Sequence, residues 1–297
     1  MKVLECGLDV GAVKPDAYDR LVAGGWLRPT SVAGLLNLTS KFETAVARLQ
    51  AALTAADPSD SPGPLWCPPV VPREVIERAE YAESFPQLLG AVHTLGGEEA
   101  VAGDAASPTD VVLAPASCYA IYPQVADSTL AEPVFFDVVG HCYRQEATSE
   151  VGRFRSFRQR EFVVIADDGY ALQWRDEWLA RGEELLTRLG LTIEVQPAND
   201  PFFGPVGEFM RVSQLQQCLK FELVTRVSAD DPGTAVASVN SHRDHLGHRF
   251  GIRFGRDGEE EPAHSSCTAF GIERVVLALI HAHGDDLDVW PDFVESR

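Results

Sequence analysis

The feature that most constrains the fold is a pair of apolar, β-prone runs separated by an arginine-rich polar segment. The runs PVFFDVV and FVVIA flank residues 140–161, which read GHCYRQEATSEVGRFRSFRQRE. Two such runs joined by a polar loop predict a β-hairpin. Side chains two or four residues apart on a strand share a face, so Arg144 and Glu146 are expected to point together on the first strand. Phe157 and Glu161 are expected to do the same on the second.

The shared face of this hairpin would carry a cation, two acids and an aromatic ring. A planar guanidinium fork suits a phosphate, and an aromatic face suits a purine base. The alternative is a solvated hairpin whose charged side chains simply face water. The rest of the chain has to decide between the two interpretations.

Composition limits the classes of function. The chain has 297 residues, 45% of them apolar, and a net charge of −19. An acidic surface argues against a protein that holds a long tract of nucleic acid, because phosphates are contacted mainly by Lys and Arg. We find neither a signal peptide nor an apolar run of the roughly 18 residues that a membrane span needs. A soluble, cytoplasmic protein is therefore expected.

The chain divides at a breaker-rich segment, DPSDSPGP, at residues 57–64. Before it, apolar residues recur every three or four positions between Ser31 and Ala56, which predicts an amphipathic helix. These residues are Leu35, Leu38, Phe42, Val46, Leu49 and Leu53. We expect residues 1–62 to form a small helical N-terminal appendage and residues 63–297 to form the main domain.

The cysteines and histidines allow several interpretations. Six widely spaced cysteines without a CxxC pair do not resemble a disulfide framework, so thiols or metal ligands are expected. Cys118 alone is more typical of a small buried hydrophobic residue. His242, His245 and His248 follow one another at three-residue intervals, which puts at most two on one helix face and alternates faces on a strand. Ordinary polar contacts are expected for them rather than a metal site.

Later segments predict the remaining elements. Residues 170–189 indicate a helix, and residues 191–196 a strand. Lys220 and Glu222 would face the same way on another strand. After a short strand from His264, an apolar helix opens at Glu273 and Arg274 and ends at Gly284. Arg274 in that first turn could reach a phosphate bound over the sheet, or it could pair with Glu273 at the surface.

Several segments resemble, in the correct order, the signature motifs of class II aminoacyl-tRNA synthetase cores. They are SFPQLLG, YRQE, a returning strand with Phe157, and GIER. Within that class the chain resembles the seryl-tRNA synthetase branch, in particular its zinc-containing archaeal form. LAPASCYAIYP, NDPFFGPVG, LKFEL and SVNSHRDHLG are also similar to the amino acid:[carrier protein] ligases, stand-alone homologues without a tRNA-binding arm. The resemblance spans about residues 65–290 and implies an α/β (α+β) fold with a largely antiparallel sheet flanked by helices.

The resemblance implies an ATP site. Arg144 would hold the α-phosphate and Arg274 the outer phosphates, so these two are the expected catalytic cations. Glu146 would hold the adenine end, and Phe157 would stack on the adenine. Two further residues are candidate magnesium ligands: Glu222 and Ser238.

The resemblance also implies a zinc site. Cys118, Glu161 and Cys267 match the three zinc ligands of the family. The chemistry of this set agrees, because two thiolates and one carboxylate leave the fourth position of zinc open. A substrate α-amino group could take that position, which would orient the amino acid for reaction.

The implied reaction has two steps. The carboxylate of a small amino acid, such as glycine or alanine, attacks the α-phosphorus of ATP and gives aminoacyl-adenylate and pyrophosphate. The phosphopantetheine thiol of a holo carrier protein then takes the aminoacyl group and releases AMP. Two alternatives stay open: transfer to another acceptor, such as tRNA or a small amine, and a non-catalytic binding paralogue.

The expected partners follow from the same resemblance. SFPQLLG corresponds to the dimer-forming motif, so a homodimer is expected. The acidic charge and the short N-terminal segment argue against tRNA. Because carrier proteins are themselves acidic, we expect docking through a local arginine or apolar patch.

Overall fold

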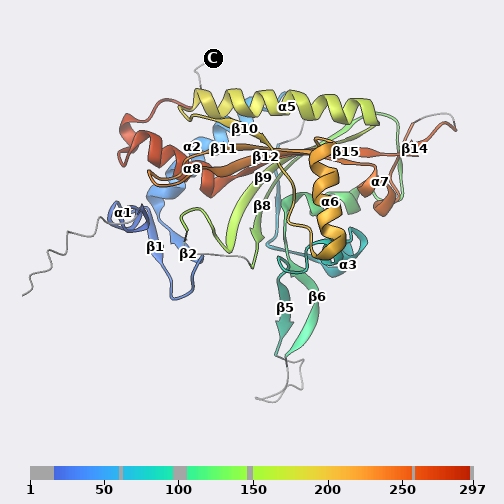
Figure 1. The fold of residues 1–297 in the computed structure, drawn as a ribbon, viewed down its shortest axis with the longest axis horizontal. Coiled ribbons are helices and arrows are strands. Elements are labelled where there is room, and N and C mark those ends of the chain that lie inside the picture. The colour runs from blue at the N-terminus through green and yellow to red at the C-terminus, as the bar shows by residue number, and fades with distance from the viewer. Residues whose placement is uncertain (1–16, 60–62, 96–105, 146–149, 256–257, 295–297) are drawn as a thin grey trace, which may run out of the picture.

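The centre of the fold is a seven-stranded sheet with the strand order β10-β11-β12-β15-β9-β8-β3 (Figure 1). The structure is a computed structural model that describes residues 17–59, 63–95, 106–145, 150–255 and 258–294. Neighbouring strands are antiparallel except for β3 with β8, which confirms the expected largely antiparallel sheet. The strands are β3 (Leu65–Cys67), β8 (Val134–Tyr143), β9 (Ser156–Ala166), β10 (Glu194–Pro197), β11 (Lys220–Thr225), β12 (Thr234–Arg243) and β15 (His264–Gly271).

The predicted hairpin is present as β8 and β9. The two strands pair from Val134 opposite Ile165 to Tyr143 opposite Ser156. Arg144 directly follows β8, and its backbone N–H donates to the carbonyl of Arg155 at 2.8 Å, so pairing extends one residue past the strand. Glu146 lies outside the described residues, and its place beside Arg144 stays a prediction.

The two faces of β9 serve different parts of the molecule. Its even-numbered residues Phe162 and Val164 belong to a core shared with α2 (Ser40–Ala56), α5 (Asp168–Arg188) and α8 (Ile272–His283). Its odd-numbered residues Val163 and Ile165 belong to a second core beneath α3 (Arg73–Arg78) and α7 (His245–Phe250). The period of two then directs Phe157, Gln159 and Glu161 away from α2, toward the open side of the sheet.

The N-terminal helix packs directly on the sheet. Helix α2 begins later than expected because Leu36–Leu38 forms strand β2 and Thr39 caps the helix, its hydroxyl accepting from the Phe42 N–H at 3.4 Å. Phe42 and Trp26 are fully buried in the core that also contains the sheet. The described N-terminal residues are thus part of one core with the main domain. The boundary expected at residue 62 lies outside the described residues and stays a prediction.

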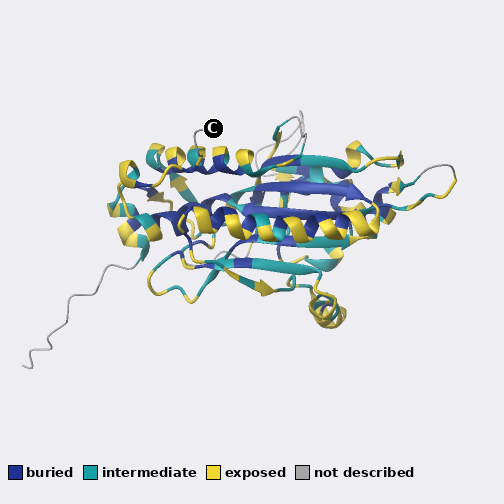
Figure 2. Cartoon of the chain, turned by 90° about the horizontal axis from the view of Figure 1, so that it is seen from above, coloured by how far each residue is buried: buried dark blue, intermediate teal, exposed yellow. Residues whose placement is uncertain are grey.

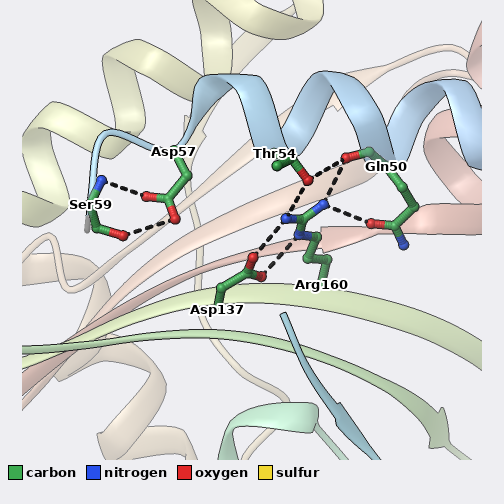
Figure 3. Close-up of polar contacts among 6 residues, drawn as sticks. All are labelled: Gln50, Thr54, Asp57, Ser59, Asp137 and Arg160. Atoms are coloured by element: carbon green, nitrogen blue, oxygen red, sulfur yellow. Dashed lines mark hydrogen bonds and ion pairs between the residues drawn. The ribbon is translucent and has the colours of Figure 1, made fainter. Parts of the chain in front are cut away.

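Polar contacts also fasten α2 to the back of the hairpin (Figure 3). Arg160 of β9 donates to both carboxylate oxygens of Asp137 on β8, at 2.9 and 2.7 Å. Its guanidinium also donates to the carbonyl and side chain of Gln50, at 2.8 and 3.0 Å, and to the Thr54 hydroxyl at 2.9 Å. The guanidinium of Arg160 therefore links β8, β9 and α2 on the face of the sheet opposite Gln159 and Glu161.

Several described helices have no counterpart in the sequence predictions, and the longest of them is α6 (Gly204–Gln216). Helix α6 lies apart from the sheet and is seen end-on in Figure 2. Its residues Val206 and Phe209 are 74% and 72% exposed. The helix predicted over residues 170–189 is α5, and the apolar helix predicted to end at Gly284 is α8. No described helix is long and apolar enough to cross a membrane.

The remaining elements are short. A β5–β6 hairpin, drawn in teal in Figure 1, projects from the side of the sheet opposite α5. Their bounds are α1 (Ala17–Ala23), β1 (Leu27–Pro29), β2 (Leu36–Leu38), β4 (Val70–Pro72), α4 (Tyr81–Ser84), β5 (Ala91–Thr94), β6 (Ser107–Leu113), η1 (Ser117–Ala120), η2 (Tyr122–Gln124), β7 (Thr129–Leu130), β13 (Arg253–Phe254), β14 (Glu261–Pro262) and η3 (Leu287–Val289).

Candidate active site

Two pockets lie side by side on the open face of the sheet. The hairpin pocket is lined by β8–β9, β11, β12 and the start of α8, and the thiol pocket by β9, β12, β15, η1 and α4. They meet along a common wall formed by five residues: Arg144, Gln159, Lys220, Ser238 and Ala269. A ligand that extends from one pocket into the other must pass this wall.

Two guanidinium groups line the hairpin pocket. The guanidinium of Arg144 lies 5.8 Å from the ring centroid of Phe157 and donates to the Pro115 carbonyl at 3.4 Å. Arg274 donates to the carbonyls of Gly152 and Ala235 at 2.9 and 3.0 Å. Backbone carbonyls hold both forks in place, and a planar guanidinium at the wall of a pocket is suited to bind a phosphate.

Glu273, the neighbour of Arg274, serves the fold. Its carboxylate is buried and accepts from the backbone N–H and the side chain of Arg158, at 2.7 and 2.6 Å. Arg158 also bonds Glu43 of α2 at 2.8 Å. These contacts hold the start of α8 against β9 and thereby position Arg274 at the wall of the hairpin pocket.

The two candidate magnesium ligands face each other across neighbouring strands. Glu222 of β11 and Ser238 of β12 are register partners, and both line the hairpin pocket. Lys220 lies two residues before Glu222 on the same face, as the spacing predicts, and its Nζ is 3.4 Å from the Glu222 carboxylate. A carboxylate and a hydroxyl are oxygen donors of the kind that magnesium prefers.

The three candidate zinc ligands come from three separate elements and line the thiol pocket together. Cys118 lies in η1, Glu161 on β9 and Cys267 on β15, and all three are at most 6% exposed. One oxygen of Glu161 accepts from the backbone N–H groups of Ser117 and Cys118, at 2.6 and 3.1 Å. The thiols of Cys118 and Cys267 are hydrogen-bonded to each other.

Electrostatics distinguish the two sulfur atoms. The hydrogen bond between the thiols raises the pKa of Cys118 and lowers that of Cys267. Asn240 Nδ2 and His242 Nε2 lie 3.4 and 3.5 Å from the Cys267 sulfur and favour its thiolate. Burial, with the Cys267 charge, raises the pKa of Glu161 to about 7. The surroundings of the pocket thus favour the thiolate at Cys267 rather than at Cys118.

Cys118, Glu161 and Cys267 form the donor set in which zinc is expected. Among the described residues, no three His, Cys, Asp or Glu side chains stand in an arrangement that could hold a metal ion. The chemistry of the set fits zinc, since thiolate sulfur and carboxylate oxygen are its usual ligands and binding would displace the proton shared by the thiols. Zinc at this site therefore stays a prediction.

The three histidines make ordinary polar contacts, as expected. His242 Nδ1 lies 2.9 Å from the Ser265 hydroxyl, and His245 Nε2 lies 3.4 Å from the Ala79 carbonyl. His248 lies 3.3 Å from Asp244, one helical turn away. Of these three histidines, only His242 lines the thiol pocket. No pattern in the sequence indicated its contact with Cys267.

The SFPQLLG segment forms a wall of the site. Phe85 and Leu88 line the thiol pocket, and the Gln87 amide donates to the Pro201 carbonyl at 2.6 Å. The Phe85 ring also packs against Phe202, with centroids 4.9 Å apart. A role of the same segment in a dimer interface stays a prediction.

The fold and the paired pockets define a class II aminoacyl-tRNA synthetase core. Residues 105–283 match the family described as tRNA synthetase class II core domain (G, H, P, S and T). Among solved structures, the chain is similar to M. kandleri seryl-tRNA synthetase in complex with A. aeolicus tRNASec, with a TM-score of 0.78 at 19% identity over 95% of this chain and 59% of that chain. Seryl-tRNA synthetase from Pyrococcus horikoshii complexed with ATP gives a TM-score of 0.70 at 18% identity, over 90% and 58%. At these identities the likeness concerns the fold.

Sequence relatives narrow the class. "Amino acid--[acyl-carrier-protein] ligase 2" of Bradyrhizobium diazoefficiens is 38% identical over 98% of this chain and 90% of its own length. Ligase 1 of the same organism is 40% identical, over 87% and 82%. The type-2 serine--tRNA ligase of Methanococcus maripaludis strain C5 is 29% identical over only 63% and 37%. The chain therefore belongs to the amino acid:[carrier protein] ligase family, as its motifs predicted.

Proposed function

We propose that this protein activates a small amino acid with ATP and transfers it to the phosphopantetheine thiol of a carrier protein. The observation that carries the proposal is the junction of the two pockets. A pocket with two anchored guanidinium groups and an aromatic ring opens directly onto a pocket with two thiols and a carboxylate. ATP in the first and an amino acid in the second would meet at Arg144.

The chain's own residues account for the first step. Arg144 would neutralise the α-phosphate while the amino acid carboxylate approaches, and Arg274 would hold the outer phosphates that leave as pyrophosphate. Phe157 would stack on the adenine, next to Glu146. Glu222 and Ser238 would hold magnesium, which offsets the charge of the departing phosphates.

Zinc would be held by Cys118, Glu161 and Cys267, and when bound it would offer an open position to the α-amino group of the substrate. Tyr81 and Phe85 line the same pocket, and we propose glycine, alanine or a residue of similar size as the substrate. Asn240 and His242 would keep the Cys267 sulfur in its ligand position.

The acceptor is proposed from the relatives. The two Bradyrhizobium proteins named as carrier-protein ligases match most of this chain at higher identity than the serine--tRNA ligases, which match less of it. We further propose that the protein acts in the cytoplasm as a homodimer and docks an acidic carrier through a local patch. tRNA is the competing acceptor.

Amino-acid-dependent pyrophosphate exchange tests the activation step. The purified protein is assayed with each of the twenty amino acids, with and without a chelator. We expect exchange with one or two small amino acids, and its loss when the chelator removes the metal. Exchange that survives complete metal removal would contradict the zinc proposal, and a lack of exchange with every amino acid would contradict activation.

A further inference from the structure

The junction between the two pockets contains a second cation that the family motifs do not assign. Of the five residues that line both pockets, two are positively charged, Arg144 and Lys220. Arg144 comes from the hairpin, whereas Lys220 is the first residue of β11 on the other side of the opening. The two cations therefore flank the place where a ligand in one pocket would touch a ligand in the other.

Lys220 is held firmly from one side. Its Nζ lies 2.6 Å from Asp200 and 3.4 Å from Glu222, and its side chain is only 12% exposed. Asp200 is itself fixed by Gln214 of α6, which donates to its carboxylate at 2.8 Å and accepts from its backbone N–H at 2.7 Å. A lysine ammonium has three N–H donors, and the hydrogen bond to Asp200 uses one of them.

Two carboxylates, Asp200 and Glu222, lie beside the ammonium of Lys220. A purely structural ion pair would satisfy the same distances. Its position argues for more, because a structural pair has no reason to line both pockets, and Glu222 is already the candidate magnesium ligand.

We infer that Lys220 is a catalytic residue that donates to the amino acid carboxylate and to an α-phosphate oxygen as the two join. This inference rests on the proposed function. In that step a carboxylate oxygen forms a bond to the α-phosphorus, and the bond from phosphorus to the bridging oxygen of the β-phosphate breaks, with its electron pair leaving on pyrophosphate. No proton moves, and Lys220 keeps its own throughout.

Two negatively charged groups must approach each other in this reaction. Arg144 and Lys220, on opposite sides of the junction, would offset both charges and the charge that develops on the oxygens of the transition state. Because Asp200 and Glu222 fix the ammonium beforehand, little reorganisation is needed when the substrates meet. The expected effect of Lys220 is therefore mainly on kcat rather than on the KM for ATP.

The test compares Lys220→Met with Lys220→Arg in the full chain by pyrophosphate exchange with the amino acid that the wild type prefers. Loss of a preorganised donor of this kind lowers kcat by about 100- to 1,000-fold. We expect that loss for Lys220→Met, with the KM for ATP changed by less than about threefold. Lys220→Arg keeps the charge, so its kcat should be about tenfold higher than that of Lys220→Met.

The matched control is Lys41→Met. Lys41 contacts the Trp26 ring at 4.2 Å and the Gly24 carbonyl at 3.1 Å and lines neither pocket, so its loss should leave kcat unchanged. Melting temperature and AMP binding establish that each variant is folded. If Lys220→Met does not fold, Asp200→Asn serves instead, since it frees the ammonium from its anchor and should also lower kcat.

The outcomes separate the two proposals. Folded Lys220→Met with a kcat within about threefold of wild type would overturn the inference and leave the proposed function standing. A rise of about 100- to 1,000-fold in the KM for ATP, without a loss in kcat, would assign Lys220 to nucleotide binding and would also overturn the inference. A wild type without exchange would overturn the proposed function and this inference together.

Discussion

The guanidinium of Arg160 and the carboxylate of Asp137 form a doubly hydrogen-bonded ion pair in the interior, with side chains 1% and 2% exposed. Arg160 points toward Gln50 and Thr54 of α2 (Figure 3). Its neighbours on β9, Gln159 and Glu161, line the pockets on the other face of the sheet. The pair therefore fixes the register of the strand on which the proposed site depends.

Removing Asp137 should destabilise the protein strongly. Asp137→Ala leaves the Arg160 guanidinium buried without its anion, and loss of one partner of such a pair costs about 3–5 kcal/mol. Urea unfolding followed by circular dichroism measures the free energy of unfolding. Glu150→Ala is the control, because its pair with Arg153 has side chains 69% and 49% exposed and should contribute less than about 1 kcal/mol. Equal losses in the two variants would contradict the assigned role.

Point substitutions should affect the proposed metal site and the proposed nucleotide site independently. Cys118→Ala or Cys267→Ala should remove zinc and amino acid activation together, whereas Arg274→Ala should keep zinc and lose ATP turnover. Elemental analysis gives the zinc content, and pyrophosphate exchange gives the activity. Cys218→Ser is the control, because Cys218 is exposed and lies outside both pockets. Full zinc content in either pocket cysteine variant would show that the ligand assignment is wrong.

His242 should affect the metal without being a ligand. Its Nδ1 faces the Ser265 hydroxyl and its Nε2 faces the Cys267 sulfur, so it is placed to orient that sulfur. Loss of such a partner typically lowers metal affinity by about 10- to 100-fold. We expect this loss for His242→Leu and a smaller one for His242→Gln, whose amide can still donate. Competition with a chromogenic chelator measures the affinity, and identical affinities for wild type and His242→Leu would refute the role.

Asp200 should contribute to stability in a pH-dependent way. Lys220 and Gln214 outweigh burial and lower the pKa of this carboxyl below its ordinary value. A depressed folded-state pKa stabilises the protein above the unfolded-state value, about 3.9, and this contribution is lost as the pH falls through the folded-state value. Asp200→Asn should therefore flatten the acid side of the curve of unfolding free energy against pH. An unchanged slope below about pH 4 would contradict this.

Local patterns in the sequence predicted much of the sheet and the spacing of its site residues. The period of two placed Phe157 with Glu161 and Lys220 with Glu222, and both pairs share a strand face in the structure. The approach of Cys118 to Glu161 and Cys267 had no local signal, because these residues lie on three elements far apart in the chain. Only the resemblance to a known family brought them together in advance.

Other features were beyond local reasoning. Helix α6 was missed because Gly204, Pro205 and Gly207 read as breakers, although proline is favourable in a first helical turn. Close packing requires glycine at position 207, since a Cβ there would lie 2.6 Å from the Phe202 carbonyl carbon. The roles of Asp200 and Gln214 around Lys220 likewise depend on loop and helix positions that no periodicity specifies.

The central claim is transfer to a carrier protein, and intact-mass spectrometry of the carrier tests it most directly. Purified holo carrier protein is incubated with the enzyme, ATP, magnesium and the preferred amino acid, with the apo carrier and total tRNA in parallel reactions. The account predicts that one aminoacyl group is added to the holo carrier only, in a bond that hydroxylamine cleaves. Adenylate formation followed by acylation of tRNA, with the holo carrier unchanged, would contradict it.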